Sequence, residues 1–461
     1  MKKNIDRREF LKIVGISAAT VGVASTMGCG GGGAAGSRGG SAMGEVPKDK
    51  MTHKKIAGTD DGVSILGYGG MRWPTLETPV RGENVIDQDA VNKLVDYAIE
   101  HGVTYFDSAP IYCQGWSEET MGNALSRHPR DSYYIATKMS NYRDFAYDSA
   151  VEMYQNSLKK LQVDYIDYYL LHNIGSDINV FRKRFIDNGV LDYLIEERKA
   201  GRIRHLGWSF HGLVENFDEI LSLHEDVHWD FVMIQLNYSD WLHAQTTFAP
   251  NVNAEYLYGE LEKRNIPVAV MEPLLGGRLS NLPEYVIERL KKREPEMSVA
   301  SWAFRFAATR PQVFTVLSGM VYQEHIEDNV RTYSPLVPLT SDEDKFLEET
   351  AAVIVSYPTI PCTDCKYCMP CPYNLDIPAI FTHYNKCVNE GYISDSQTDE
   401  NYKEARRAYL VGYDRSVPKL RQAKMCIGCE ECVRYCPQRI DIPEQLKKID
   451  DYIEKLKQGT L

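Results

Sequence analysis

The stretch "DAVNKLVDYAIEHGVTYFDSAPIY", residues 89–112, decides the fold of this chain. Its first part, residues 89–102, is a helical stretch, and residues 104–109 form a short apolar run expected of a parallel strand buried on both faces. The same alternation continues from about Lys54 to Ser341. Seven further strands are expected at residues 63–69, 133–138, 165–172, 203–209, 231–237, 266–273 and 313–319. Eight strand–helix units predict an α/β fold, a (β/α)8 TIM barrel. The alternative is a doubly wound open sheet, but no Gly-x-Gly-x-x-Gly turn follows the first strand.

Four polar residues lie at or just beyond the ends of three successive expected strands, where a barrel carries its chemistry: Asp107, Tyr112, Lys138 and His172. A tyrosine with an ordinary pKa near 10 is a poor acid at neutral pH, and a nearby ammonium lowers that pKa. A carboxylate would hold the lysine, and a neutral histidine can orient a carbonyl. The group suits protonation of an oxygen while hydride arrives at the adjoining carbon. Taken singly, the aspartate could cap a helix, the lysine could be a surface residue and the histidine a core residue.

The segment "GVTYFDSAPIYCQGWSEETMGNAL", residues 102–125, and the barrel region around it resemble the aldo-keto reductase family. The resemblance implies a nicotinamide-dependent enzyme that interconverts a small carbonyl compound and an alcohol. It implies that Tyr112 is the general acid/base, that Lys138 and Asp107 tune it, and that His172 orients the substrate.

The same resemblance implies a dinucleotide site formed by Ser209, Gln235, Gly276, Gly277, Arg278, Ser318, Gly319 and Asn329. Loops after strands seven and eight are the usual phosphate site of a barrel, although the two adjacent glycines could also form a plain tight turn. Three positions depart from the family pattern: Phe210 replaces an asparagine, Met271 replaces a stacking tyrosine, and Tyr322 replaces an arginine that grips a 2′-phosphate. The choice between NADP and NAD is therefore left open.

Two short cysteine runs near the C-terminus predict two [4Fe–4S] clusters. The runs read "CTDCKYCMPCP" and "CIGCEECVRYCP", and their cysteines are Cys362, Cys365, Cys368, Cys371, Cys426, Cys429, Cys432 and Cys436. The second run matches the C-x2-C-x2-C-x3-C-P pattern of bacterial two-cluster ferredoxins, and the first has one residue fewer before its last cysteine. Zinc is the alternative metal. Disulfides fit poorly, because thiols this close in sequence rarely meet bridge geometry.

The surroundings of the two runs repeat as well. "CPYNLDIP" begins at Cys371 and "CPQRIDIP" at Cys436, an offset of 436 − 371 = 65 residues, which indicates two pseudo-equivalent halves. By resemblance to two-cluster ferredoxins, the last cysteine of each run ligates the other run's cluster. The chain as a whole is similar to aldo-keto reductases with a C-terminal ferredoxin-like domain. We expect the barrel at residues 49–341 and a small, mainly helical iron–sulfur domain at residues 342–461.

The N-terminus, residues 1–29, has the layout of a signal peptide: basic residues, a short apolar stretch, then small residues. Arg7 and Arg8 precede "EFLK", which resembles the twin-arginine signal for export of folded proteins, and predicts a periplasmic location. Cys29 resembles a lipoprotein acceptor, which would add a membrane anchor. The Gly/Ser-rich residues 30–48 predict a flexible tether. The alternative is an ordinary amphipathic start or an unused signal.

Composition limits the partners. A net charge of −12 argues against nucleic acid or an anionic membrane surface, and a 43% apolar fraction is typical of a folded core. We expect a small-molecule substrate and a redox partner protein. The clusters could transfer electrons or be structural. A second hypothesis is an electron-transfer or binding protein on a reductase scaffold that no longer turns over.

Overall fold

The computed structural model describes residues 44–56, 59, 61–76, 84–247 and 251–461. The expected export signal, Cys29 and most of the expected tether lie outside the described residues.

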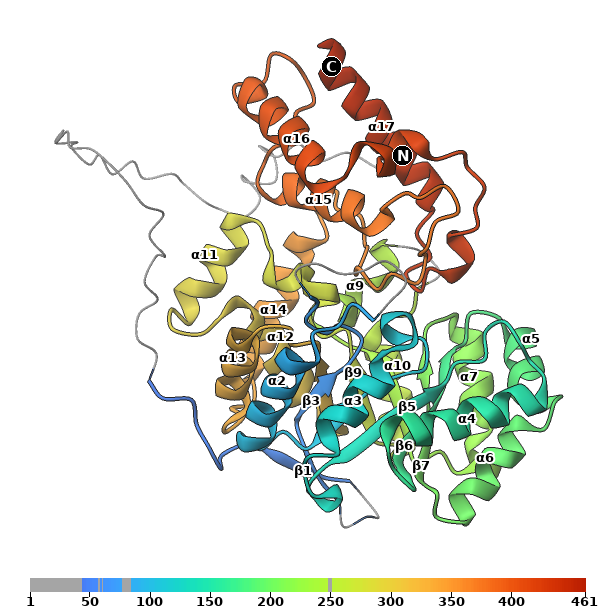
Figure 1. The fold of residues 1–461 in the computed structure, drawn as a ribbon. Helices are drawn as coiled ribbons and strands as arrows, with labels where there is room; N and C mark the ends of the chain where they lie inside the picture. The colour runs from blue at the N-terminus through green and yellow to red at the C-terminus, as the bar shows by residue number, and fades with distance from the viewer. Residues whose placement is uncertain (1–43, 57–58, 60, 77–83, 248–250) are drawn as a thin grey trace. The chain divides into compact units, whose positions relative to one another are not determined.

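Eight parallel strands close into a barrel in the order β10-β3-β4-β5-β6-β7-β8-β9, which confirms the predicted (β/α)8 fold (Figure 1). Each strand pairs with its sequence neighbours, and β10 pairs with β3 to close the ring. The strands are β3 (Leu66–Gly69), β4 (Tyr105–Asp107), β5 (Tyr134–Met139), β6 (Ile166–Ile174), β7 (Ile203–Phe210), β8 (Phe231–Gln235), β9 (Val268–Met271) and β10 (Val313–Ser318). Because all run the same way, their C-terminal ends meet at one mouth, where a barrel carries its chemistry.

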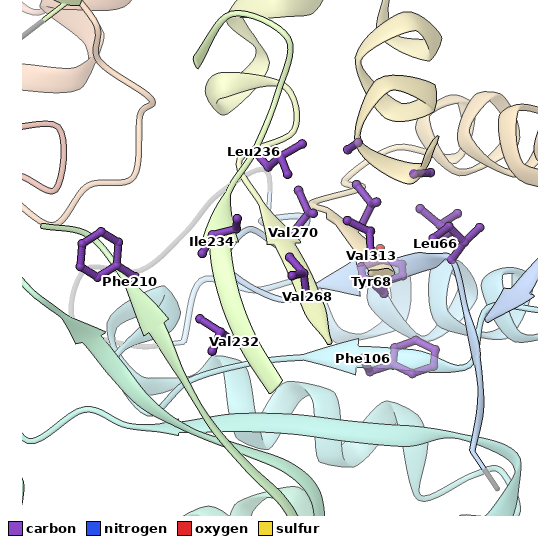
Figure 2. Close-up of a cluster of buried hydrophobic side chains, with 14 of the residues drawn as sticks. Leu66, Tyr68, Phe106, Phe210, Val232, Ile234, Leu236, Val268, Val270 and Val313 are labelled. Carbon is purple, nitrogen blue, oxygen red and sulfur yellow. The ribbon is translucent and has the colours of Figure 1, made fainter. Parts of the chain in front are cut away.

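Side chains on each barrel strand alternate between two cores. On β8, Val232 and Ile234 pack in the larger cluster, whereas Met233 belongs to a second cluster. On β9, Val268 and Val270 lie in the first cluster and Ala269 in the second. Figure 2 shows the first set together with Leu66 and Tyr68 of β3 and Phe106 of β4. This period of two is the physical reason that the strands are apolar on both faces.

Helices connect and surround the barrel strands (Figure 1). The first is α2 (Gln88–Glu100), and the side chain of Asp87 just before it accepts a hydrogen bond from Ala90 N. This helix buries Val91, Leu94, Val95 and Ala98 on one stripe. The others are α3 (Ser117–Leu125), α4 (Tyr147–Leu161), α5 (Ile178–Phe181), α6 (Val190–Lys199), α7 (Val214–Ser222), α8 (His224–Val227), α9 (Asp240–Thr247), α10 (Ala254–Lys263), α11 (Glu284–Arg293), α12 (Val299–Thr309), α13 (Gln323–Tyr333) and α14 (Ser341–Ile354). Short helical turns are η1 (Tyr112–Gly115), η2 (Arg130–Ser132), η3 (Arg182–Ile186) and η4 (Leu275–Ser280).

The first expected strand, residues 63–69, is two strands. β2 (Gly62–Ser64) pairs antiparallel with β1 (His53–Lys55), and β3 then begins at Leu66. The Ser64 hydroxyl donates to Leu66 O at 2.6 Å, a local bond of the kind that competes with regular strand pairing. Val63 joins the same cluster as Met233 and Ala269, so the hairpin contributes to that core.

The segment after the barrel has a core of its own, built on α15 (Ile377–Asn389), α16 (Tyr402–Ser416) and α17 (Ile442–Gln458), with short turns η5 (Lys419–Arg421), η6 (Ala423–Met425) and η7 (Val433–Tyr435). The repeat expected from the sequence is structural too. α15 and α17 each follow a cysteine run, and their caps Asp376 and Asp441 accept from Ala379 N and Glu444 N. Within the described residues, none of the helices combines the length and the apolar character needed to span a bilayer.

Candidate functional site

The barrel mouth brings together all four residues expected to carry the chemistry. Asp107 is the last residue of β4, Lys138 lies in β5, His172 lies in β6, and Tyr112 begins η1. All four are buried; the most exposed is Tyr112, at 8%. The shared C-terminal end of the strands is what joins positions that lie far apart in sequence.

Lys138 and Asp107 form a buried ion pair. Lys138 Nζ donates to Asp107 Oδ1 at 2.5 Å and to Ser108 O at 2.7 Å. Burial raises the pKa of the Asp107 carboxyl and lowers the pKa of the Lys138 ammonium, and the charge of each partner opposes that effect on the other. One hydrogen bond of the ammonium thus joins the pair, and the other fixes the lysine to the backbone after β4.

Tyr112 lies against this pair and against His172. Lys138 Nζ is 4.8 Å from the centroid of the Tyr112 ring, and the His172 ring lies 5.6 Å away, edge-on at 82°. Burial, followed by the charge of Asp107, raises the pKa of the Tyr112 hydroxyl well above 10. In this arrangement burial outweighs the effect expected from the lysine, so Tyr112 is a protonated phenol and a weaker acid than the sequence predicts.

His172 is held neutral and its backbone is fixed. Burial and the charge of Lys138 lower the pKa of its imidazole well below 6.5. Ser140 Oγ lies 2.6 Å from Nδ1, and Arg184 Nη2 donates to the backbone oxygen of His172 at 3.0 Å. Nothing in the sequence singled out Ser140 or Arg184, because a lone serine or arginine carries no pattern. A neutral imidazole whose Nδ1 is engaged leaves Nε2 to face a ligand.

Nε2 of His172 faces Tyr367, which belongs to the first cysteine run. The Tyr367 hydroxyl lies 3.3 Å from Nε2 and shares a hydrogen bond with the Tyr112 hydroxyl. Tyr367 is 195 positions from His172, so no local pattern could have indicated this contact.

The two cysteine runs and the residues just after them share a pattern of left-handed backbone positions. At matching positions in the two halves, φ is positive: Asp364 (53°), Lys366 (64°) and Asn374 (64°) in the first, and Gly428 (73°), Glu430 (62°) and Arg439 (52°) in the second. Left-handed residues among right-handed ones turn successive backbone N–H groups inward, which forms the nests found at iron–sulfur sites. The repeat holds although the first run has one residue fewer before its last cysteine.

One cavity is lined by four cysteines that come from both runs: Cys362, Cys365, Cys368 and Cys436. Apolar side chains, among them Phe381 and Ile440, line most of the rest of it, together with Thr363, Lys366 and Gln438. Burial raises the pKa of Cys362 and of Cys365 to about 12, so cations must compensate the thiolates that ligate a metal. The set fits a [4Fe–4S] cluster and has the crossed composition that the sequence predicts.

The second set is defined by the neighbours of Cys432. Burial raises the pKa of the Cys432 thiol to about 11, and the nearby Cys426, Cys371 and Cys429 also contribute to the rise. Cys371 of the first run therefore lies close to cysteines of the second run. The described residues contain no group of three or more His, Cys, Asp or Glu placed to hold a single ion. A cluster instead spreads its thiolates over several irons.

With this geometry in place, comparison with known proteins decides the family. A profile described as "Aldo/keto reductase family" matches residues 65–351, well over half of the chain. The chain belongs to the aldo/keto reductase family. A second profile, "4Fe-4S dicluster domain", matches residues 361–440, so this reductase carries a 4Fe-4S dicluster domain after its barrel.

Relatives and solved structures cover the reductase barrel. "Uncharacterized oxidoreductase YqkF" of Bacillus subtilis is 24% identical over 314 residues, 65% of this chain and 96% of that protein. "L-galactose dehydrogenase" of Arabidopsis thaliana is 25% identical over 337 residues, 66% and 95% of the two chains. An aldo-keto reductase from Bacillus halodurans, in its holo form, has a TM-score of 0.52 at 24% identity and covers 65% of this chain and 96% of its own. One from Klebsiella pneumoniae in complex with NADPH has a TM-score of 0.51 at 21% identity, with 66% and 96% covered. Both structures support the barrel fold.

The residues expected at the dinucleotide site divide into two groups. Ser209 lies near the end of β7 with its hydroxyl accepting from Asn173 N at 2.8 Å, and Ser318 ends β10 and accepts from Asn329 at 3.0 Å. Gly319 follows Ser318. Both hydrogen bonds join residues of the barrel. On the β7 and β10 sides of the mouth, the C-terminal segment therefore does not take part in these two contacts.

The remaining residues are engaged by the C-terminal segment. Gln235 Oε1 accepts from Gln438 at 2.9 Å, and Arg278 Nη2 donates to Thr359 Oγ1 at 2.9 Å. At Gly276, which has φ 67° and precedes Gly277, a Cβ atom would lie 2.0 Å from Thr363 O. In this arrangement the β8 and β9 sides of the mouth are covered by the chain's own C-terminal segment.

Proposed function

We propose that the protein is an oxidoreductase that interconverts a small carbonyl compound and an alcohol at Tyr112. The observation that carries this proposal is the convergence of the phenol, the Lys138–Asp107 pair and the neutral His172 at the mouth of the barrel. Membership of the aldo/keto reductase family supports the same reaction class.

The chain's own residues handle the proton. In the reduction, His172 Nε2 would hold the carbonyl oxygen, and Tyr112 would give that oxygen its proton while the adjoining carbon is reduced. As the phenolate forms, Lys138 Nζ would stabilise its charge, and Asp107 keeps the ammonium in position. Burial of the four side chains excludes water from this transfer.

A nicotinamide dinucleotide, NADP or NAD, is the hydride carrier that we propose. It is supported by the family match, and the Klebsiella pneumoniae relative is described in complex with NADPH. When bound, the group supplies hydride to the carbonyl carbon. Ser209, Ser318 and Asn329 would hold it, and Gln235 and Arg278 would first have to leave their C-terminal partners.

We propose that the eight cysteines hold two [4Fe–4S] clusters, in the crossed sets described above. The cavity with its four cysteines supports the first cluster. A hydride carries two electrons and a cluster normally moves one, so exchange with a redox partner protein would need two successive transfers. We further propose export by the twin-arginine route to the periplasm, with Cys29 as a lipid acceptor; the Arg7–Arg8 pair supports it.

A second candidate is an electron-transfer or binding protein on a reductase scaffold without turnover. The engagement of Gln235, Gly276 and Arg278 by the C-terminal segment favours it, because these residues are expected to hold the dinucleotide.

The Tyr112→Phe variant separates the two candidates, because it removes the proton and keeps the ring. Anaerobically purified protein would be assayed with a panel of aldehydes and NADPH or NADH by loss of absorbance of the reduced cofactor. We expect turnover to fall by about 10²–10⁴-fold, the usual contribution of a general acid. Tyr373→Phe is the matched control, since that side chain is 45% exposed and far less buried than Tyr112. Full activity of Tyr112→Phe would reject the proposed role. Failure of the wild type to turn over any aldehyde or to bind either dinucleotide would favour the second candidate.

A further inference from the structure

The position that a substrate's oxygen must occupy is defined by two groups. To be protonated by Tyr112 and oriented by His172, a carbonyl oxygen has to lie within hydrogen-bond reach of the Tyr112 hydroxyl and of His172 Nε2. The Tyr367 hydroxyl lies at that position: it is 3.3 Å from Nε2 and shares a hydrogen bond with the Tyr112 hydroxyl. The active site therefore already holds a hydroxyl oxygen, which is supplied by the chain itself.

The loop that carries Tyr367 is firmly seated on the barrel. Arg72 Nη2 donates to Thr363 O at 2.7 Å and to Asp364 O at 3.0 Å. Thr363 O also packs onto Gly276 so closely that no side chain could fit there. The contact of Tyr367 with the active site is therefore part of a wider interface between this loop and the barrel. It does not depend on the side-chain rotamer of Tyr367 alone.

Iron–sulfur binding does not by itself require a tyrosine at this position. The internal repeat pairs Tyr367, between Cys365 and Cys368, with Glu431, between Cys429 and Cys432. Glu431 is exposed and pairs with Arg434 three residues away. The two loops share their backbone conformation, so the tyrosine is a feature of the half that faces the barrel.

The same segment covers the side of the mouth where a hydride carrier would bind. Gln438, two residues after Cys436, donates to Gln235, and Thr359 accepts from Arg278. Occupation of the oxygen site and coverage of the dinucleotide residues therefore belong to one closed arrangement.

We propose that Tyr367 is an internal ligand of the active site, and that carbonyl or alcohol substrates bind only when the loop of residues 362–368 withdraws it. The inference rests on the proposed function, because it takes Tyr112 and His172 as the groups that bind the substrate oxygen. It adds a gate that links access to the barrel with the conformation of the first cysteine run.

The test measures binding of 4-nitrobenzaldehyde, a simple activated carbonyl compound, to the full-length protein by anaerobic calorimetry. Tyr367→Ala removes the ring, Tyr367→Phe removes only the hydroxyl, and Tyr373→Ala is a control on an exposed tyrosine of the same segment. If the site is closed in about nine molecules of ten, opening it raises the apparent affinity about tenfold. We expect that gain for Tyr367→Ala, a smaller gain for Tyr367→Phe, and none for Tyr373→Ala. Iron and sulfide content, measured on each variant, reports whether the clusters are retained. If Tyr367→Ala loses its clusters, the affinity of Tyr367→Phe for the aldehyde is the deciding measurement.

Equal affinity in wild type and both Tyr367 variants, weaker binding in the variants, or no binding in any of them would overturn the proposal. Turnover of the same aldehyde with NADPH is measured in parallel on Tyr367→Ala with and without Tyr112→Phe. A gain in binding without any turnover would leave the internal ligand standing and count against the proposed reaction. Loss of turnover with unchanged binding would make Tyr367 a catalytic residue instead.

Discussion

Replacing Lys138 with methionine should destabilise the barrel strongly. The two side chains of the Lys138–Asp107 pair are 1% and 3% exposed, and the second carboxylate oxygen, Asp107 Oδ2, has no hydrogen-bond partner among the residues that the structure describes. Removing the ammonium leaves a buried carboxylate without the counter-charge that contacts it. Breaking such a pair costs about 3–5 kcal/mol, a large part of the roughly 5–15 kcal/mol that holds a typical domain.

The destabilisation of Lys138→Met should depend on pH, in a direction that follows from the pKa of Asp107. Burial raises the pKa of Asp107, and loss of Lys138 removes the main influence that opposes the rise. Above the unfolded-state pKa of about 3.9 the native variant then binds more protons than the unfolded chain, so its free energy of unfolding falls as pH rises, by at most about 1.4 kcal/mol per pH unit. Lys138→Met should therefore be less destabilised at pH 5 than at pH 7.

Urea unfolding followed by tryptophan fluorescence measures the barrel alone, because the six tryptophans all lie between Trp73 and Trp302. The matched control is the double variant Asp107→Asn with Lys138→Met, which removes the buried charge together with its partner. It should recover much of the lost stability. A loss below about 1 kcal/mol for Lys138→Met at pH 7, or a double variant whose loss equals the sum of the single losses, would refute the buried ion pair as described.

Two further predictions test the crossed clusters and the protonation of His211. Cys371→Ser should remove the cluster ligated by Cys426, Cys429 and Cys432 and leave the cluster of the cavity intact, as read from the iron content and the electron paramagnetic resonance of the reduced protein; loss of the cavity's cluster alone would contradict the crossing. Burial lowers the pKa of His211 to about 4, so between that value and about 6.5 the unfolded chain binds the extra proton, and the free energy of unfolding should fall as pH drops, by up to about 1.4 kcal/mol per unit. His211→Asn should show a flatter dependence between pH 6.5 and 5 in the same urea assay, and an unchanged slope would assign the acid sensitivity to other groups.

Local patterns were enough to predict much of the fold and part of the site. Eight apolar runs separated by helical stretches predicted the closed barrel, because a parallel strand buried on both faces needs an apolar residue at nearly every position. Asp107, Lys138 and His172 were recognisable because each stands at a strand end, and strand ends converge in a barrel. The cysteine runs were recognisable because one metal centre needs several thiolates from one short loop.

Other features could not be predicted, because they depend on contacts between distant segments. The bend at Ile65 that divides the first expected strand depends on a hairpin and on Ser64, which the apolar pattern does not reveal. Ser140 and Arg184 act on His172 through single hydrogen bonds, and isolated polar residues carry no periodic signal.

By itself, the sequence determined the barrel, the residues at its mouth and the two cysteine runs, since spacing along the chain is enough to encode strand period and ligand loops. Only the tertiary structure decided that the first cysteine run lies on the barrel mouth. There it brings the Tyr367 hydroxyl to Tyr112 and His172, and it covers Gly276. The physical reason is that a hydrogen bond between residues 195 positions apart depends on how two folded parts pack, and packing of this kind leaves no local pattern in the sequence.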